Sequence, residues 1–382
     1  MAHTQLGGEQ IAAIKFSFIK GDEKLLENLL NSFGDDPYFD KWHLNQLESN
    51  KDKAREIIKQ EQQFDTWEAY EDFRNEMKNI NSPVTRFEKA VEAIISGDAK
   101  TLIDQLKENP ELVFARSVRN HHSTLLNYIG ANGVENYRQK TPVNAVEIAR
   151  ILLDAGSEVD ARGDMYKTTT TLGLVATSVH SFLAGVQNNL IDILLKYGAD
   201  PNNAIGKEYT EGLLIVACLR NGRGESAKYL STKGATLDLE GACGVGILEE
   251  VKKYFTAEGK LIDEKLRSKY ESGYAWACGY GYLEIVKFCL KHGIAIDMIA
   301  EGMTGLHWAV VGARIDIIEY LLAQNAPLEI KNEYGGTVLG QALWSAYNSP
   351  SPGYPLIIQM LLNAGAIVEP GWEKYIQEIL SR

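Results

Sequence analysis

The chain has 382 residues, of which 45% are hydrophobic and 24% charged, the composition of a folded globular protein. Its formal net charge of −12 repels a polyanion, and no block of Lys and Arg offers the basic face that nucleic-acid binding needs. The apolar stretches fall short of the roughly 20 residues that cross a bilayer, and the polar start carries no export signal. We therefore expect a soluble, cytoplasmic protein that binds neither nucleic acid nor membrane.

Four cysteines lie among apolar residues without forming a CxxC pair: Cys218, Cys243, Cys278 and Cys289. This pattern predicts buried, reduced thiols, as is usual in a cytoplasm. The seven histidines show neither an HExxH motif nor a Cys/His ligand spacing. We expect no bound metal and no cofactor.

The first 86 residues are predicted to form a helical region of their own. Residues 12–30 can be laid over residues 90–106, so that a Gly-Asp-x-Lys turn coincides in both. Residues 51–77 favour a helix, which Pro83 and its preceding residues would end. The region is either a degenerate first unit with a helical cap over the apolar face of the first repeat, or an arm that folds over a groove or against a second subunit.

From residue 87 to residue 370 the chain repeats a leucine-rich helix end followed by a stop residue. Gly and Asn both tolerate the left-handed backbone conformation in which helices end. The spacing of the stops averages about 35 residues, which predicts seven to eight stacked helix pairs. The stops are Gly156, Gly198, Gly234, Gly259, Gly293, Asn325 and Gly365.

The clearest unit, residues 303–337, resembles the ankyrin repeat. Its residues Thr304-Gly305-Leu306-His307-x-Ala309 stand where that family has Thr-Pro-Leu-His-x-Ala, and other units keep fragments of this signature. The resemblance implies an all-α ankyrin-repeat solenoid of stacked antiparallel helix pairs, with helical caps at both ends. It also implies that His307 fastens its own turn by hydrogen bonds. Residues 371–382 have apolar side chains at helical spacing and would form the C-terminal cap.

The predicted array is irregular in two ways. Three units are lengthened between their two helices, within residues 129–152, 176–194 and 342–361. Insertions in repeat proteins often fall on the binding face and can wall a groove into a pocket, although surface loops also lengthen at little cost. The unit after Gly234 has only 25 residues, so we expect a gap in the row of hairpins, which either kinks the array or admits a ligand.

Aromatic side chains are predicted on the concave face that the first helices form. Trp276, Trp308 and Trp344, together with Tyr274, suit either the hot spot of a protein partner or the binding of a sugar-like ring, or else they pack between repeats. In an earlier unit, His122, Asn127 and Tyr128 fall on corresponding elements. These seven residues are the candidate partner- or ligand-binding residues.

His121, Arg138 and His180 are the candidate catalytic residues. They belong to the first helices and insertions near residues 121–185, and histidine exchanges protons near neutral pH. They would serve a small-molecule or carbohydrate-active enzyme whose pocket the insertions wall. The chain has no nucleophile elbow, phosphate loop or paired-carboxylate spacing, so an enzyme is the less favoured hypothesis.

The favoured hypothesis is a binding module that recognises a partner protein through its concave face, as ankyrin arrays generally do. The acidic charge would suit a basic partner, such as a toxin. A small-molecule ligand and a purely structural role are the alternatives.

Overall fold

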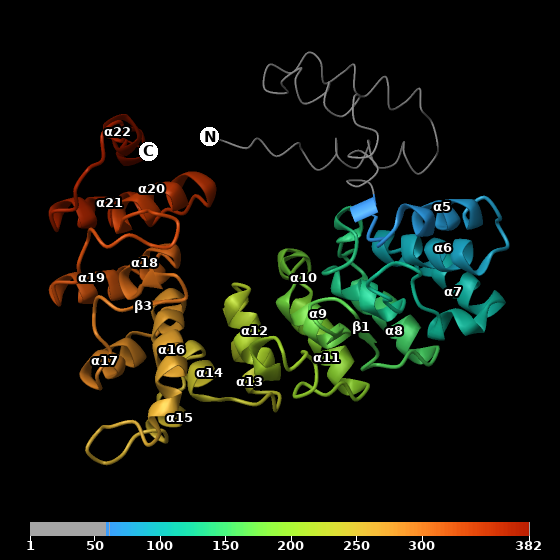
Figure 1. The fold of residues 1–382 in the computed structure, drawn as a ribbon, viewed down its shortest axis with the longest axis horizontal. Coiled ribbons are helices and arrows are strands. Elements are labelled where there is room, and N and C mark those ends of the chain that lie inside the picture. The colour runs from blue at the N-terminus through green and yellow to red at the C-terminus, as the bar shows by residue number, and fades with distance from the viewer. Residues whose placement is uncertain (1–58, 61, 382) are drawn as a thin grey trace. The chain divides into compact units, whose positions relative to one another are not determined.

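The computed structural model describes residues 59–60 and 62–381. The chain divides into two compact units, residues 1–212 and residues 213–382 (Figure 1). The expected unit over residues 12–30 lies outside the described residues. The fold is all-α, with a few short strands, as the sequence predicts.

In unit 1, α5 (Trp67–Glu76) precedes three helix pairs in the described part of the chain. The first members of the pairs pack in one layer: α6 (Pro83–Ser96), the 3₁₀ helix η2 (Leu126–Gly130) and α9 (Thr171–Thr177). The second members pack in a second layer: α7 (Ala99–Glu108), α8 (Ala145–Asp154) and α11 (Gln187–Lys196). Shorter elements connect them: η1 (Pro110–Phe114), η3 (Asn136–Arg138), α10 (Val179–Leu183) and η4 (Thr210–Gly212).

Unit 2 has five helix pairs, and the two members of the last three pairs form separate columns in Figure 1. The first members are α12 (Leu214–Arg220), α14 (Leu239–Gly244), α16 (Arg267–Tyr280), α18 (Gly305–Val311) and α20 (Val338–Asn348). The second members are α13 (Gly224–Ser231), α15 (Leu248–Lys252), α17 (Leu283–Lys291), α19 (Ile315–Ala323) and α21 (Tyr354–Asn363). The 3₁₀ helix η5 (Glu264–Leu266) precedes α16, and α22 (Glu373–Leu380) packs on α20 and α21.

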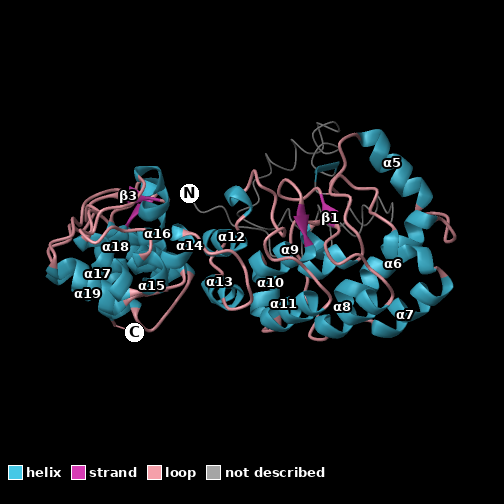
Figure 2. Cartoon of the chain, turned by 90° about the horizontal axis from the view of Figure 1, so that it is seen from below, coloured by secondary structure: helices cyan, strands magenta, loops and turns pink. Residues whose placement is uncertain are grey.

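Each unit contains one short antiparallel strand pair directly before a first helix (Figure 2). In unit 1, β1 (Arg162–Gly163) pairs with β2 (Thr169–Thr170). In unit 2, β3 (Ile299–Ala300) pairs with β4 (Met303–Thr304), with Ile299 opposite Thr304. A two-residue turn, Glu301 and Gly302, therefore joins β3 to β4.

The helices end where the sequence predicts, with one exception. All seven predicted stop residues have positive φ, and six of them follow a second helix by two or three residues. The exception is Gly259: α15 already ends at Lys252, and Gly259 lies in the turn between Phe255 and Leu261, which form an isolated β-bridge. Gly259 therefore shapes a loop rather than a helix end.

The core is a stack of alanine, leucine and isoleucine side chains between the layers. On α19, Ile317 and Leu321 are fully buried at a spacing of four residues, the period of a helix face. Burial of one such side chain contributes about 1.5–3 kcal/mol, so neighbouring pairs stabilise one another. Thr304 caps α18 by accepting from the backbone N–H of His307. His307 Nδ1 lies 2.7 Å from Thr304 Oγ1 and Nε2 lies 3.2 Å from the carbonyl oxygen of Gly336, so His307 does fasten its turn.

The three insertions lie between the two helices of their pairs, as predicted. The first spans residues 131–144 and includes η3, the second includes α10, and the third is the loop at residues 349–353. The short unit lacks a strand pair, because residues 232–238 connect α13 to α14 without extended pairing. Within the described residues, no helix combines the length and the apolar run that crossing a bilayer requires.

Candidate partner-binding site

Two of the three candidate catalytic residues lie inside unit 1, in a buried ionic network. Arg138 Nη1 is 2.5 Å from Glu88 Oε2 and 3.1 Å from Glu135 Oε1. Arg119 forms ion pairs with the same two carboxylates. His121 Nε2 lies 3.4 Å from the other oxygen of Glu135. The side chains of Arg119, Glu88 and Glu135 are at most 3% exposed.

The charges of this network hold one another in place. Burial by itself would raise the pKa of Glu135, but the guanidinium of Arg119 keeps that pKa well below its usual range. Burial would likewise lower the pKa of Arg138, yet the carboxylate of Glu88 raises it well above its usual value. Glu135 and Arg138 are therefore both held in their charged forms, and each is paired with the other inside the protein.

The network also fastens the start of the described chain to the first helix pair. Arg119 Nη1 donates to the carbonyl oxygen of Gln62 at 2.8 Å, and its guanidinium lies 4.5 Å from the ring centre of Phe73. Gln62 precedes α5 and Phe73 lies on it, whereas Arg119 follows η1. The geometry indicates an internal fastening of unit 1. The third catalytic candidate, His180, is on α10, and burial lowers its pKa.

Asn127 and Tyr128 are also fully buried in unit 1. Asn127 takes the place that His307 has in its unit: its Oδ1 accepts from the backbone N–H of Thr124 at 2.9 Å, and its Nδ2 donates to the carbonyl oxygen of Ala161 at 3.1 Å. The hydroxyl of Tyr128 donates to Glu135 at 3.3 Å. Neither side chain is available at the surface. His122 is exposed, with its Nδ1 2.7 Å from Asp164 Oδ2.

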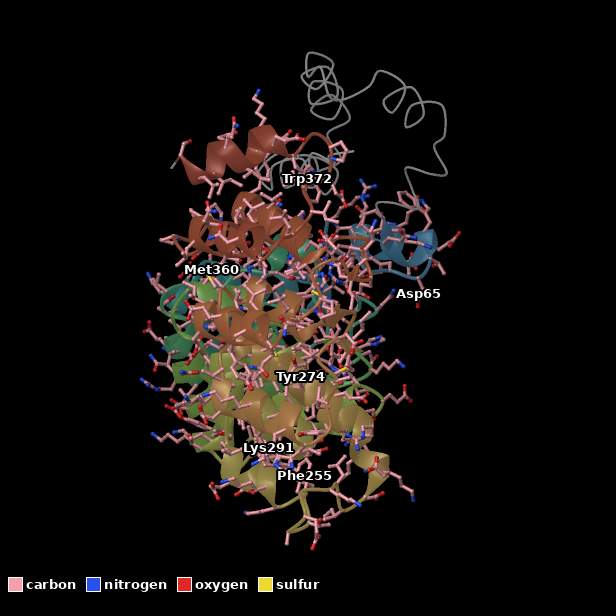
Figure 3. The ribbon with its side chains drawn as sticks, turned by 90° about the vertical axis from the view of Figure 1, so that its left-hand side faces the viewer. Asp65, Phe255, Tyr274, Lys291, Met360 and Trp372 are labelled. Atoms are coloured by element: carbon pink, nitrogen blue, oxygen red, sulfur yellow. The ribbon has the colours of Figure 1, made fainter. Side chains whose placement is uncertain are left out.

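The aromatic candidates of unit 2 lie at three depths. Tyr274 is fully buried inside the helix stack (Figure 3), and Trp276 is 3% exposed. Trp308 is half-buried, and Trp344 is 61% exposed. Only the last two present ring surface to a partner.

The exposed rings form part of a larger apolar surface that we call the apolar ridge: Trp308, Val311, Trp344 and Tyr347. Tyr347 is 76% exposed and follows Trp344 by three residues on α20, as Val311 follows Trp308 on α18, so each pair shares a helix face. Val311 and Trp344 each come seven residues after the capping threonine of their helix, and α18 packs on α20. The sequence analysis missed Tyr347, although its spacing from Trp344 is a signal that could have found it.

A second feature, which we call the acid–tryptophan site, adjoins the ridge at Trp308. The rings of Trp276 and Trp308 meet edge to face, with centres 5.0 Å apart. Trp276 Nε1 donates to Glu240 Oε1 at 2.9 Å. Glu301 Oε1 accepts from Ser272 Oγ at 2.8 Å and from Arg220 Nη2 at 3.0 Å. Arg220 Nη2 is also 3.7 Å from Glu240 Oε1, so one nitrogen serves both carboxylates.

These residues come from elements that are far apart in the chain. Arg220 ends α12, and Glu301 belongs to the β3–β4 turn, 81 residues later. Burial raises the pKa of Glu240, although the hydrogen bond from Trp276 and the charge of Arg220 oppose that rise.

The third insertion walls a cavity of about 510 Å³. Its lining combines Ala346 of α20, Tyr354 and Pro355 of α21 and Ile379 of α22 with Pro350, Ser351 and Pro352 of the insertion. The lining has no titratable group except the Tyr354 phenol, whose hydroxyl donates to the carbonyl oxygen of Val311 at 3.2 Å. The cavity therefore suits an apolar side chain better than a reaction.

Comparison with known proteins identifies the repeat. Residues 239–332 and 276–369 match the model for ankyrin repeats in three copies. Over 71 residues the chain is 34% identical to Palmitoyltransferase AKR1 of Candida glabrata, an alignment that covers 18% of this chain and 9% of that protein. The human ASB11 ankyrin repeat domain aligns with 73% of this chain and 99% of its own, at 18% identity and a TM-score of 0.37.

Proposed function

We propose that the chain binds a basic partner protein through the apolar ridge of unit 2, because residues 239–369 match ankyrin repeats, which act as protein-interaction modules. The observation that carries this proposal is the exposure of Trp344 and Tyr347 on one face of α20. Large aromatic rings dominate the energy of protein interfaces, and a contiguous exposed set of them is uncommon on a surface that binds nothing.

Charge supports the basic character of the partner. Residues 293–381, which contain the ridge, hold nine acidic and three basic residues. An acidic surface around an apolar ridge attracts a positively charged protein and speeds its association at low salt. A basic toxin is one protein of this kind. The four cysteines are buried thiols that form no disulfide, which suits the reducing cytoplasm in which we place this interaction.

A capture experiment tests the proposal. The full chain is immobilised as wild type, as the ridge variant Trp344→Ala/Tyr347→Ala, and as a control variant Leu356→Ala/Tyr375→Ala, whose two side chains are comparably exposed on α21 and α22. Captured proteins are quantified by mass spectrometry. We expect a set of basic proteins that the ridge variant loses by roughly tenfold or more and the control retains, with capture falling as salt is raised.

Equal capture by the wild type and the ridge variant would contradict the proposal. Capture of acidic proteins that is insensitive to salt would contradict the basic character of the partner. Thermal transitions of the three proteins are compared first, so that a loss of capture cannot be a loss of folding.

A further inference from the structure

We infer that the acid–tryptophan site of unit 2 receives the guanidinium group of an arginine from the partner, and that Arg220 holds this place in the free protein. The inference rests on the proposed function and deepens it by naming a chemical group that the partner must present. The ridge supplies apolar contact, whereas this site would select arginine.

The chemistry of the site matches a guanidinium. The carboxylates of Glu240 and Glu301 both face Arg220 Nη2, at 3.7 and 3.0 Å. A planar guanidinium has five N–H donors, so it can bind two carboxylates at once, which an ammonium does less well. The indole pair of Trp276 and Trp308 forms an apolar wall next to these carboxylates.

Arg220 fills the site only partly. One nitrogen serves both acids, the contact with Glu240 is long, and the side chain remains 37% exposed. Two carboxylates against one guanidinium leave a net charge of −1. Because Arg220 keeps part of its water and contacts Glu240 only at long range, a better-placed guanidinium can displace it at small cost.

The backbone at Glu301 points to the same use. Glu301 and Gly302 form the two-residue turn of the hairpin with φ of 50° and 78°. Turns of this kind favour Asn, Asp or Gly at the first position, because other residues are strained at positive φ. A glutamate is placed there nevertheless, and its carboxylate accepts from Arg220 and Ser272.

The site is also within reach of a bound partner. Trp308 belongs both to the site and to the apolar ridge, and it is half-buried. A segment that lies along Trp344 and Val311 therefore continues onto the edge of the Trp276–Trp308 pair. An arginine at that end of the segment would meet Glu301 first, because the Glu301 side chain is 22% exposed and that of Glu240 only 8%.

The test uses the full chain and a blocked pentapeptide, Gly-Gly-Arg-Gly-Gly, with lysine and citrulline versions as probes of charge and shape. Citrulline has the outline of arginine without its charge. Binding is followed by NMR titration of the indole N–H signals of Trp276 and Trp308. We expect Arg220→Gln to bind the arginine peptide at least about tenfold more tightly than the wild type does, and to bind the other two peptides less tightly than the arginine peptide.

Arg267→Gln is the matched control. It removes the same charge from a half-buried arginine that pairs with Glu264, outside the site. We expect no gain in peptide affinity from it, and we expect Glu301→Gln to abolish the gain when added to Arg220→Gln. Arg220→Lys provides a second variant, with a smaller gain than Arg220→Gln because a cation is kept.

The inference is overturned if Arg220→Gln binds the arginine peptide no better than the wild type, if the citrulline or lysine peptide binds equally well, or if Arg267→Gln shows the same gain. Its failure is separable from that of the proposed function. The titration contains no partner protein, whereas the ridge variant is judged by capture alone.

Discussion

The ionic network of unit 1 and the acid–tryptophan site of unit 2 use the same residue types at different depths. In unit 1, Arg119 and the carboxylate of Glu135 are at most 1% exposed and surrounded by packed rings. In unit 2, Arg220 is 37% exposed and Glu301 22%. A charge that has lost its water depends entirely on its partners, whereas a charge that keeps part of its water can exchange them. Depth, and not residue type, separates a structural ion pair from an exchangeable one.

The largest loss of stability is expected on replacement of Arg119, whose side chain is only 1% exposed. Replacing it with alanine leaves Glu88 and Glu135 with Arg138 as the remaining guanidinium within the network. Removing one partner of a buried ion pair costs about 3–5 kcal/mol, because the other charge stays buried. Urea denaturation of Arg119→Ala should show that loss, and Arg220→Ala a loss of about 1 kcal/mol or less. Equal losses in the two variants would remove the distinction drawn from depth.

The second largest difference in stability between the two regions is expected at acid pH. The pKa values of Glu88 and Glu135 are lowered in the folded chain, since the attraction of Arg119 and Arg138 outweighs burial. Their contribution to stability is therefore complete above the unfolded pKa of about 4.3 and is lost as pH falls toward the folded value. Between pH 5 and pH 3 the wild type should lose stability more steeply than Glu135→Gln, by up to about 1.4 kcal/mol per pH unit. Parallel slopes in urea denaturation would contradict the assignment.

The pKa of Glu240 shifts in the opposite direction to the pKa values of Glu88 and Glu135. Burial raises its pKa in the folded chain, so protonation favours the folded state as pH falls. Glu240→Gln should therefore leave the acid slope of the wild type unchanged or make it steeper. The acid slopes of Glu135→Gln and Glu240→Gln can thus be compared with that of the wild type in a single pH series.

The repeat was predictable because it depends on local signals. A Gly or Asn stop needs only its own backbone conformation, and six of the seven predicted stops follow a helix end. The signature around His307 likewise joins residues close in the chain, and its bonds are as expected. Gly259 misled because α15 is only five residues long and ends well before it.

The candidate site was only half predictable, because it depends on burial. His121 and Arg138 look like exposed titratable groups in the sequence, yet their depth results from contacts with residues far along the chain, such as Glu88. The contact of Arg220 with Glu301 also joins residues that are distant in the chain. The spacing of the sequence located aromatic residues on the first helices, but it did not show that Trp276 is far less exposed than Trp344.

A smaller effect is expected at the two equivalent turns. Asn127→Ala in unit 1 and His307→Ala in unit 2 each remove a side chain that bonds its own capping threonine and the backbone of the next unit. Leaving such buried groups unpaired costs about 1–3 kcal/mol. Both variants should lose stability by similar amounts in urea denaturation. A neutral Asn127→Ala would show that Asn127 does not fasten its turn.

The smallest effect on stability is expected at Trp344. Its ring is 61% exposed, so Trp344→Ala should change the free energy of unfolding by about 0.5 kcal/mol or less. The neighbouring Leu343 is 8% exposed, and Leu343→Ala should cost about 2–5 kcal/mol in the same urea experiment. A loss above about 2 kcal/mol in Trp344→Ala would mean that the ring stabilises α20 and does not serve mainly as a contact for a partner. The capture lost by the ridge variant would then reflect damaged packing of α20. The contrast between buried side chains and side chains exposed to a partner would then depend on Tyr347 alone.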